Sequence, residues 1–187
     1  MILDLGCGKS KKNGAIGIDF IKMPGVDVVC DLNKGLPLPD NSVDGIYASH
    51  ILEHLDDFMF AMKEIWRVLK KNGWVKIWVP HFSAGFITWG DPTHKRGFSI
   101  GTFECFLPER NITYIKNHFL VDELRLNFAL GGKIVKGKKI KHKIYLFFGM
   151  IIEKIVNRNR MAQKSFESHW SQFFPFCEIY VKLKVLK

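Results

Sequence analysis

The sequence contains few cysteines, and nothing in their spacing would join them. Cys7, Cys30, Cys105 and Cys177 are spread along the chain, and no two of them form a C-x-x-C pair. This spacing excludes a zinc ribbon and the disulfide framework of a small secreted domain. Scattered cysteines of this kind are typical of proteins from a reducing compartment.

Long hydrophobic runs are also missing. The longest, IYLFFGMII at residues 144–152, is far shorter than the ~20 residues that a membrane-spanning helix needs. The N-terminal stretch MILDLGCGKS contains neither a basic leader nor a cleavable apolar segment. We therefore expect a cytoplasmic protein without a membrane span.

Acidic residues are scarcer than basic ones. The 187 residues include 28 lysines and arginines against 18 aspartates and glutamates, which gives a formal net charge of +10. Much of the excess lies in residues 131–143, GGKIVKGKKIKHK, which carry six lysines and no acid. This balance favours acidic partners such as nucleic acid or an anionic membrane surface. A solvated loop explains the lysines equally well, so both interpretations stay open.

Four short apolar runs, rich in Ile, Val and Leu, make up the first part of the chain. They cover residues 1–6, 15–20, 26–32 and 43–49. None alternates cleanly between apolar and polar residues, which is typical of buried parallel strands. Asp4, Asp19 and Asp31 stand at or near the ends of the first three runs. Ligands of open α/β sheets bind beyond these ends, so the three acids indicate a site.

The connections between the first three runs are short. About eight residues join the first to the second and about five join the second to the third, whereas a parallel crossover normally needs a dozen or more. We expect this half of the sheet to have one poorly covered face. Further along, the apolar spacing predicts a long helix over residues 51–70, and residues 73–80 read as a fifth strand.

Residues 81–187 are less regular. Residues 81–99 mix aromatic, small and charged side chains, and this pattern predicts a functional loop. A strand is expected over residues 119–130, and a helix that is apolar in its middle and basic at both ends over residues 141–160. Apolar residues alternate with lysine near the C-terminus, which predicts an exposed edge strand over residues 176–187.

Residues 3–8, LDLGCG, form the strongest local motif. A strand that runs into Gly6-x-Gly8 lets a ligand approach the backbone closely, because glycine has no side chain to clash with it. Asp19 follows where a carboxylate can accept hydrogen bonds from both hydroxyls of a ribose. Asp31, at the end of the third run, is placed to bind an adenine amino group.

The chain resembles the class I S-adenosylmethionine-dependent methyltransferases, in particular the methyltransferase type 11-like branch, on four stretches in the family's order. They are LDLGCG, GIDF, CDLNKGLPLPDNSVDGIYASHILEHL and EIWRVLKKNG. The resemblance covers residues 3–79, and DPTHKRGFS at residues 91–99 is similar to a segment of some members. It implies one α/β domain over residues 1–187, with a Rossmann-like, mostly parallel sheet and an antiparallel strand at the C-terminal edge. Residues 1–80 would bind the cofactor, and residues 81–187 would form the substrate or cap half.

The resemblance also implies which residues surround the cofactor, S-adenosyl-L-methionine. In this sequence they are Asp4, Gly6, Cys7 and Gly8 at the methionine part, Asp19 and Phe20 at the ribose, Asp31 and Leu32 at the adenine, and Ser49 and His50 after the fourth strand. Ser10 stands where the family usually has a third glycine, and the helix after the motif is nearly absent. We therefore expect a less enclosed cofactor than is usual in the family.

Residues 50–54, HILEH, have a second interpretation. H-x-x-E-H is the signature of a class of zinc peptidases, so a zinc hydrolase that uses His50-x-x-Glu53-His54 is a remote alternative. Such a site needs a third ligand from a following helix, and Glu64 lies too close along the predicted helix to supply it. The resemblance instead assigns the stretch to the start of the helix after the fourth strand. We predict no metal ion.

The predicted catalytic residues lie in the loop after the fifth strand. The sulfonium of the cofactor already activates the methyl group, so the protein's main task is alignment for in-line attack. An acceptor that is protonated at neutral pH also needs a general base. His94 and His81 are the candidates, and Asp91 could orient either one. That Asp91 and His94 only brace a turn is an equally good interpretation.

The acceptor of the methyl group stays open at this stage. We expect a small metabolite or a glycan or lipid precursor, because the signature for methylating exocyclic base nitrogens is absent where the fourth strand ends. Contact with nucleic acid through residues 131–143 and peripheral membrane contact through residues 141–160 are further expectations. The alternative is a non-catalytic member of the fold that binds the cofactor or acts as a scaffold.

Overall fold

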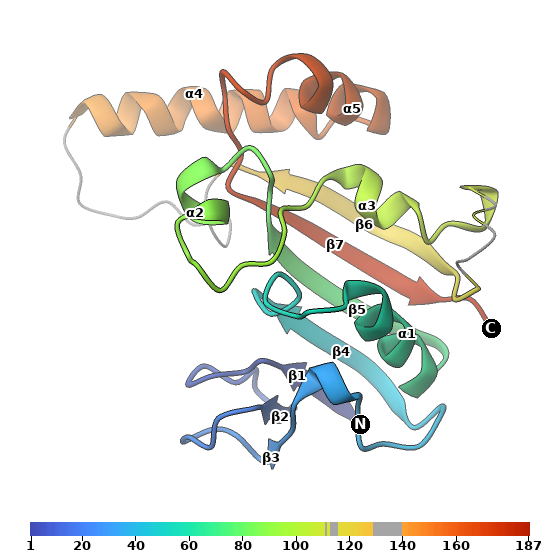
Figure 1. Cartoon of the computed structure of the whole chain (residues 1–187). Coiled ribbons are helices and arrows are strands. Elements are labelled where there is room, and N and C mark those ends of the chain that lie inside the picture. Colours follow the sequence, from blue (N-terminus) through green and yellow to red (C-terminus); the bar gives the residue numbers. More distant parts are fainter. Residues whose placement is uncertain (111, 113–115, 129–139) are drawn as a thin grey trace.

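A seven-stranded sheet runs through the molecule in the order β3-β2-β1-β4-β5-β7-β6 (Figure 1). The strands are β1 (Ile2–Leu5), β2 (Ile16–Asp19), β3 (Val28–Val29), β4 (Val43–Ser49), β5 (Leu69–Pro80), β6 (Phe119–Asn127) and β7 (Glu178–Val185). The structure is a computed structural model that describes residues 1–110, 112, 116–128 and 140–187, with the backbone only for residues 140–146.

The first five strands are parallel, and β7 is antiparallel to both of its neighbours. This arrangement confirms the predicted fold class, including the antiparallel pairing towards the C-terminal edge. The short crossovers are confirmed as well, because no helix separates β1 from β2 or β2 from β3 in this described stretch. The third strand is shorter than predicted, with only two residues in place of residues 26–32.

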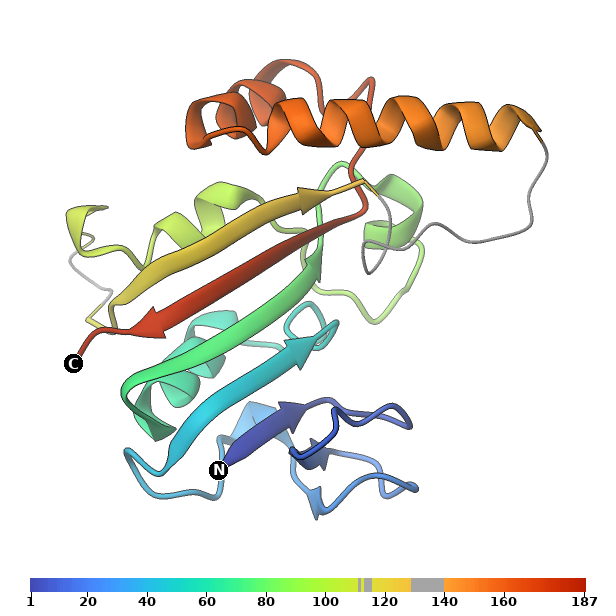
Figure 2. The same ribbon diagram turned by 180° about the vertical axis from the view of Figure 1, so that it is seen from behind.

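The helices lie mainly on one face of the sheet. They are η1 (Leu32–Lys34), α1 (Phe58–Val68), α2 (Gly85–Trp89), α3 (Ile100–Glu104), η2 (Pro108–Arg110), α4 (Ile140–Val156) and α5 (Arg160–His169). Seen from behind, strands β4, β5, β7 and β6 have no described helix in front of them (Figure 2). Aromatic rings cover part of this face instead, since Trp78 stacks between Tyr47 and Tyr180 at centroid distances of 6.4 and 4.9 Å.

The predicted helix over residues 51–70 is wrong at its start. Helix α1 begins only at Phe58, where the Asp57 side chain accepts a hydrogen bond from the backbone N of Phe60 at 2.9 Å. The residues before it form a loop, and His50 has a φ of 53°, a left-handed conformation that no helix continues. A helical apolar pattern runs through both segments, but the cap at Asp57 decides where the helix starts.

The prediction that residues 176–187 form an exposed edge strand is also wrong. Strand β7 lies between β5 and β6, so both of its edges are paired. Lys182 and Lys184 place their Nζ atoms 2.5 and 3.1 Å from the two carboxylate oxygens of Asp122 on β6. The alternation with lysine therefore arises because one face of this interior strand is exposed to solvent.

The other predictions for the second half can be compared with the described elements. The strand predicted over residues 119–130 is β6, which ends at Asn127, and the helix predicted over residues 141–160 is α4, which ends at Val156 and is followed by α5. No described helix is long and apolar enough to cross a membrane. Of the basic segment, residues 131–139 lie outside the described residues.

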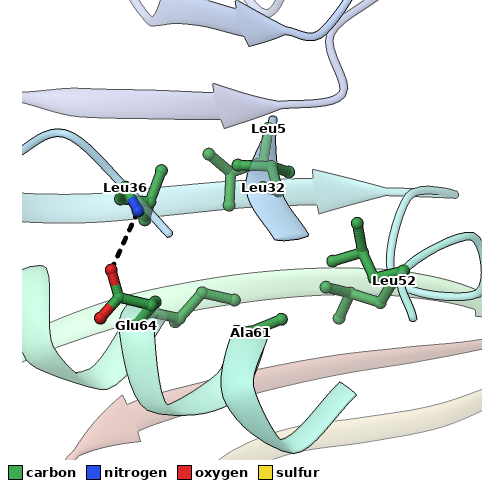
Figure 3. Close-up of a pocket in the computed structure, with 8 residues that line it drawn as sticks. Leu5, Leu32, Leu36, Leu52, Ala61 and Glu64 are labelled. Carbon is green, nitrogen blue, oxygen red and sulfur yellow. Dashed lines mark hydrogen bonds between the residues drawn. The ribbon is translucent and has the colours of Figure 1, made fainter. Parts of the chain in front are cut away.

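A clamp fastens the chain after β3 to helix α1. Glu64 on α1 accepts a hydrogen bond from the backbone N of Leu36 at 2.9 Å, beside a leucine-rich core that includes Leu5 and Leu32 (Figure 3). Arg67, one turn further along, donates to the carbonyl oxygens of Leu36 at 2.9 Å and of Leu38 at 2.8 Å. This clamp sets the position of the adjoining η1 turn.

Candidate functional site

A cleft of about 730 Å³ opens beyond the carboxyl ends of the parallel strands. This is the place where open α/β sheets bind ligands, and the volume is within the range of small-molecule sites. The residues that line the cleft are Gly6, Asp19, Phe20, Cys30, Asp31, Leu32, Asn33, His50, Ile51, His54, Leu55, Pro92, Thr93 and Lys95. Six of the ten predicted cofactor residues are among them.

The turn after β1 requires glycine because of its backbone conformation and a close contact. Gly6 and Gly8 have φ values of 61° and 51°, which L side chains rarely adopt. A Cβ atom at Gly6 would also lie 2.7 Å from Cγ1 of Ile51, in direct collision. The turn therefore brings bare backbone to the floor of the cleft.

Asp19 and Asp31 are the two carboxylates of the cleft, and backbone hydrogen bonds hold both. Asp19 accepts from the N of Gly8 at 3.0 Å and from the N of Ile21 at 3.1 Å. Asp31 caps the η1 turn by accepting from the N of Asn33 at 3.0 Å. A carboxylate has about four acceptor positions, so both keep capacity for the hydroxyl or amino groups of a ligand.

Four predicted cofactor residues, Asp4, Cys7, Gly8 and Ser49, do not line the cleft. Asp4 is only 3% exposed and accepts a hydrogen bond from the N of Lys12 at 2.7 Å, and burial raises its pKa. Cys7 is also buried, and burial raises the pKa of its thiol. These two side chains therefore bond to the backbone of the neighbouring turns and do not line the cleft.

His50 lines the cleft with a ring that is bonded at both nitrogens. Its Nδ1 lies 3.2 Å from Oε1 of Glu53, and its Nε2 lies 3.0 Å from Oε2 of Glu178 at the start of β7. Burial alone would lower the His50 pKa, but the hydrogen bonds with Glu178 and Glu53 outweigh it and raise the pKa to about 9. The ring is therefore positively charged at neutral pH.

The structure separates the three predicted catalytic residues. His81 is completely buried, away from the cleft, with Nδ1 2.7 Å from Oγ of Ser83 and Nε2 3.0 Å from Oε1 of Glu167. A ring that is buried and bonded at both nitrogens does not fit a general base. His94 and Asp91 instead lie beside Thr93, a residue that lines the cleft.

The loop that carries Asp91 and His94 is fastened to the loop before α1. The N of Lys95 donates to the O of Glu53 at 2.7 Å. Arg96 donates to the O of Leu55 at 2.9 Å and to the O of Asp56 at 2.7 Å. The resemblance of DPTHKRGFS to a family segment was the only sequence signal for this arrangement. The two loops together form one rim of the cleft.

Hydrogen bonds orient both histidines of this rim. The Nδ1 of His54 lies 2.8 Å from Oγ1 of Thr93, and that hydroxyl lies 2.6 Å from Oδ1 of Asp91. The Nδ1 of His94 lies 2.8 Å from the backbone O of Thr88. The hydrogen bond from the Thr93 hydroxyl lowers the Asp91 pKa. Asp91 thus orients His54 through Thr93, rather than His94 or His81 as predicted.

Comparison with known proteins places this cleft in a family context. The model of the methyltransferase domain family matches residues 3–77. A relative from Mycolicibacterium smegmatis, named a probable S-adenosylmethionine-dependent methyltransferase, is 30% identical over 115 residues, which are 51% of this chain and 45% of the relative. The chain thus spans less than half the length of this curated relative.

Solved structures agree with the fold. A SAM-dependent methyltransferase from Archaeoglobus fulgidus aligns with a TM-score of 0.60 and 20% identity, over 98% of this chain and 85% of the other. Phosphoethanolamine N-methyltransferase 2 from Haemonchus contortus, in complex with S-adenosyl-L-methionine, aligns with a TM-score of 0.55 and 18% identity, over 98% and 48%. The comparisons confirm the predicted resemblance to class I S-adenosylmethionine-dependent methyltransferases, with S-adenosyl-L-methionine as the cofactor of that class.

Proposed function

Because residues 3–77 match the methyltransferase domain family, we propose that this protein transfers the methyl group of S-adenosyl-L-methionine to a small acceptor. The observation that carries the proposal is the cleft itself, in which the Gly6 turn meets the carboxylates of Asp19 and Asp31. The bare backbone and the two oriented acceptors suit a ligand with a ribose and an amino-bearing base. The volume of the cleft, about 730 Å³, is large enough for such a ligand.

The chain's own residues would bind and align the two reactants. Asp19 would accept hydrogen bonds from the ribose hydroxyls, and Asp31 with Leu32 would hold the adenine. The bound cofactor supplies a methyl group that its sulfonium already activates. Correct placement of an acceptor beside it can contribute up to ~7–11 kcal/mol to lowering the barrier.

The rim formed by residues 50–57 and 91–96 would receive the acceptor. Among the predicted catalytic residues, His94 remains a candidate general base. General base catalysis would increase the rate by ~10²–10⁴-fold. His81 loses its candidacy because no acceptor in the cleft could reach its buried ring. Asp91 would act by holding Thr93 and, through it, His54.

The acceptor class we favour is a small metabolite or a precursor of a glycan or lipid. Helix α4 supports the lipid side of this proposal, because Phe147, Phe148 and Ile155 are each more than half exposed. An apolar helix surface of this kind suits peripheral contact with a membrane. Contact with nucleic acid through residues 131–143 and a cytoplasmic location remain predictions.

Calorimetric titration with S-adenosyl-L-homocysteine, the demethylated cofactor, tests the proposal. We expect 1:1 binding that weakens by about 100-fold or more in Asp19→Asn, because a hydrogen bond to a charged group contributes about 1.5–3 kcal/mol and two are affected. Asp122→Asn, which changes a carboxylate on β6 far from the cleft, is the matched control and should bind normally. Absence of binding in the wild-type protein would support the scaffold alternative.

A further inference from the structure

We propose that Glu53, His54 and His94 form a binding site for a divalent metal ion of the Zn²⁺ type at the rim of the cleft. Each residue offers one ligand atom, and the three atoms all lie within 4.8 Å of one another. The ligands of a tetrahedral zinc ion lie ~3.3 Å apart, as follows from Zn–N distances of about 2.0–2.1 Å. Shifts of about 1 Å in side chains on two loops would close the site.

The first observation for this site is an unsatisfied carboxylate oxygen. Glu53 is completely buried, and its Oε1 pairs with Nδ1 of His50 at 3.2 Å. Its Oε2 is also buried and has no hydrogen-bond partner in the part of the chain that the structure describes. A buried polar atom without a partner destabilises the fold, so it needs a physical explanation. A metal ion at Oε2 would supply the missing partner.

The second observation is the way in which the two imidazole rings are held. The Nδ1 of His94 faces a backbone carbonyl oxygen, that of Thr88, which only accepts hydrogen bonds. In the neutral ring, Nδ1 therefore carries the proton and Nε2 presents its lone pair. No described residue bonds this Nε2, so it is available to a metal ion.

His54 reaches the same state through two steps. The Thr93 hydroxyl donates a hydrogen bond to the Asp91 carboxylate at 2.6 Å, so the Thr93 oxygen is left to accept from Nδ1–H of His54 at 2.8 Å. The Nε2 of His54 then presents its lone pair as well. Metal-binding histidines are commonly oriented in this manner, through a hydrogen bond from the other ring nitrogen to a carbonyl or a polar neighbour.

The ligand set differs from the one that HILEH suggests. His50 is excluded, because Glu53 and Glu178 occupy both of its ring nitrogens. The third ligand is His94, which comes from a separate loop. Two imidazole nitrogens and one carboxylate oxygen are a known catalytic zinc set that leaves one coordination position open. Such nitrogen ligands do not suit Mg²⁺ or Ca²⁺.

The open position would hold an acceptor oxygen next to the cofactor, since His54 and Thr93 both line the cleft. A bound Zn²⁺ polarises such an oxygen as a Lewis acid. This role rests on the proposed function, whereas the binding of the ion rests on the three side chains alone.

Titration of the chelator-treated, full-length protein with Zn²⁺ and with Mg²⁺ tests the site. We expect one Zn²⁺ per chain, with binding at least about 100-fold tighter than that of Mg²⁺ because two ligands are nitrogens. Glu53→Gln, His54→Gln and His94→Gln should each weaken Zn²⁺ binding by about 100-fold or more. His169→Gln, which removes an exposed histidine at the end of α5, is the matched control and should leave the affinity unchanged.

Thr93→Val tests the orientation of the ligands without removing one of them. It replaces a hydroxyl by a methyl group and should weaken Zn²⁺ binding by about 10–100-fold, the usual effect of losing such a support. Circular dichroism of the metal-free variants verifies that each is folded. Co²⁺ in place of Zn²⁺ should give visible d–d bands without a sulfur charge-transfer band, which distinguishes this site from the cysteines.

Absence of Zn²⁺ binding, or binding that His54→Gln and His94→Gln leave unchanged, would overturn the proposal. Titration of the same samples with S-adenosyl-L-homocysteine separates the two proposals. Zn²⁺ binding without nucleoside binding would contradict the proposed function and support the metal site. Normal nucleoside binding without Zn²⁺ binding would do the reverse.

Discussion

The protein has two histidine clusters, a buried one around His81 and one at the rim of the cleft around His54 and His94. They differ in how completely their polar atoms are bonded. In the buried cluster, both ring nitrogens of His81 have partners, and Oε1 of Glu167 also accepts from the backbone N of Ile100 at 2.8 Å. In the rim cluster, His54 and His94 are bonded only at Nδ1 among the described residues. The rim also contains Oε2 of Glu53, for which the described part of the chain offers no hydrogen-bond partner.

The difference shows how to separate a structural histidine from a functional one. A buried polar network in which every atom has a partner stabilises one arrangement of the chain. A network that leaves ring nitrogens and a carboxylate oxygen without partners, beside a cleft, has retained binding capacity at a cost in stability. By this criterion His81 is structural, whereas His54 and His94 belong to a site.

The largest effect on stability should come from the buried cluster. His81→Phe keeps a ring of similar size but removes the hydrogen-bond partner of Glu167 and Ser83 at a completely buried position. We expect a loss of about 3 kcal/mol in the free energy of unfolding, measured by urea denaturation at neutral pH. The affinity for S-adenosyl-L-homocysteine should not change. A loss below about 1 kcal/mol would mean that His81 is not structural in this sense.

Local sequence patterns predicted the first half of the molecule well. A strand that ends in Gly-x-Gly needs only the glycines themselves to permit the turn at Gly6 and Gly8. The acids at strand ends follow in the same way, because parallel strands place Asp19 and Asp31 at one edge of the sheet. These features depend on residues that are close together in the sequence, and they can therefore be predicted from it.

Contacts between distant segments could not be predicted in this way. The partner of His50 is Glu178, and nothing near either residue indicates the pairing. The rim forms because residues 91–96 fold back onto the loop before α1. This loop could not be predicted from the sequence, because the apolar spacing assigns residues 51–70 to a helix. An apolar periodicity shows which side chains are buried but not where the helix starts, and here one cap at Asp57 changed the positions of His50 and His54.

The clamp between Glu64 and Arg67 should have a smaller effect on stability, and this effect should depend on pH. The hydrogen bond from Arg67 lowers the pKa of Glu64 below its ordinary value of 4.5. A group with a depressed folded-state pKa stabilises the fold above its unfolded pKa, and this stability is lost as the pH falls through the folded value. Glu64→Gln should therefore cost about 1–2 kcal/mol at pH 7.

The pH dependence provides the test of this second prediction. Urea denaturation at neutral pH and at about pH 3 should show that the difference between wild type and Glu64→Gln shrinks in acid. Glu109→Gln, which changes an exposed carboxylate on η2, controls for the general effect of losing one carboxylate. A difference that stays constant with pH would mean that the carboxylate charge of Glu64 does not stabilise the fold.

The smallest effect should come from the rim cluster in the absence of metal. His94→Gln removes one hydrogen bond, to the O of Thr88, from a ring that is only partly buried, so the unfolding free energy should fall by less than about 1 kcal/mol. Zn²⁺ should then separate the two clusters. An ion present at about 100 times its Kd stabilises the wild type by about 2.7 kcal/mol, and His81→Phe should keep this gain while His94→Gln loses it. An equal gain in all three proteins would show that the ion binds elsewhere, and the distinction between the clusters would then fail.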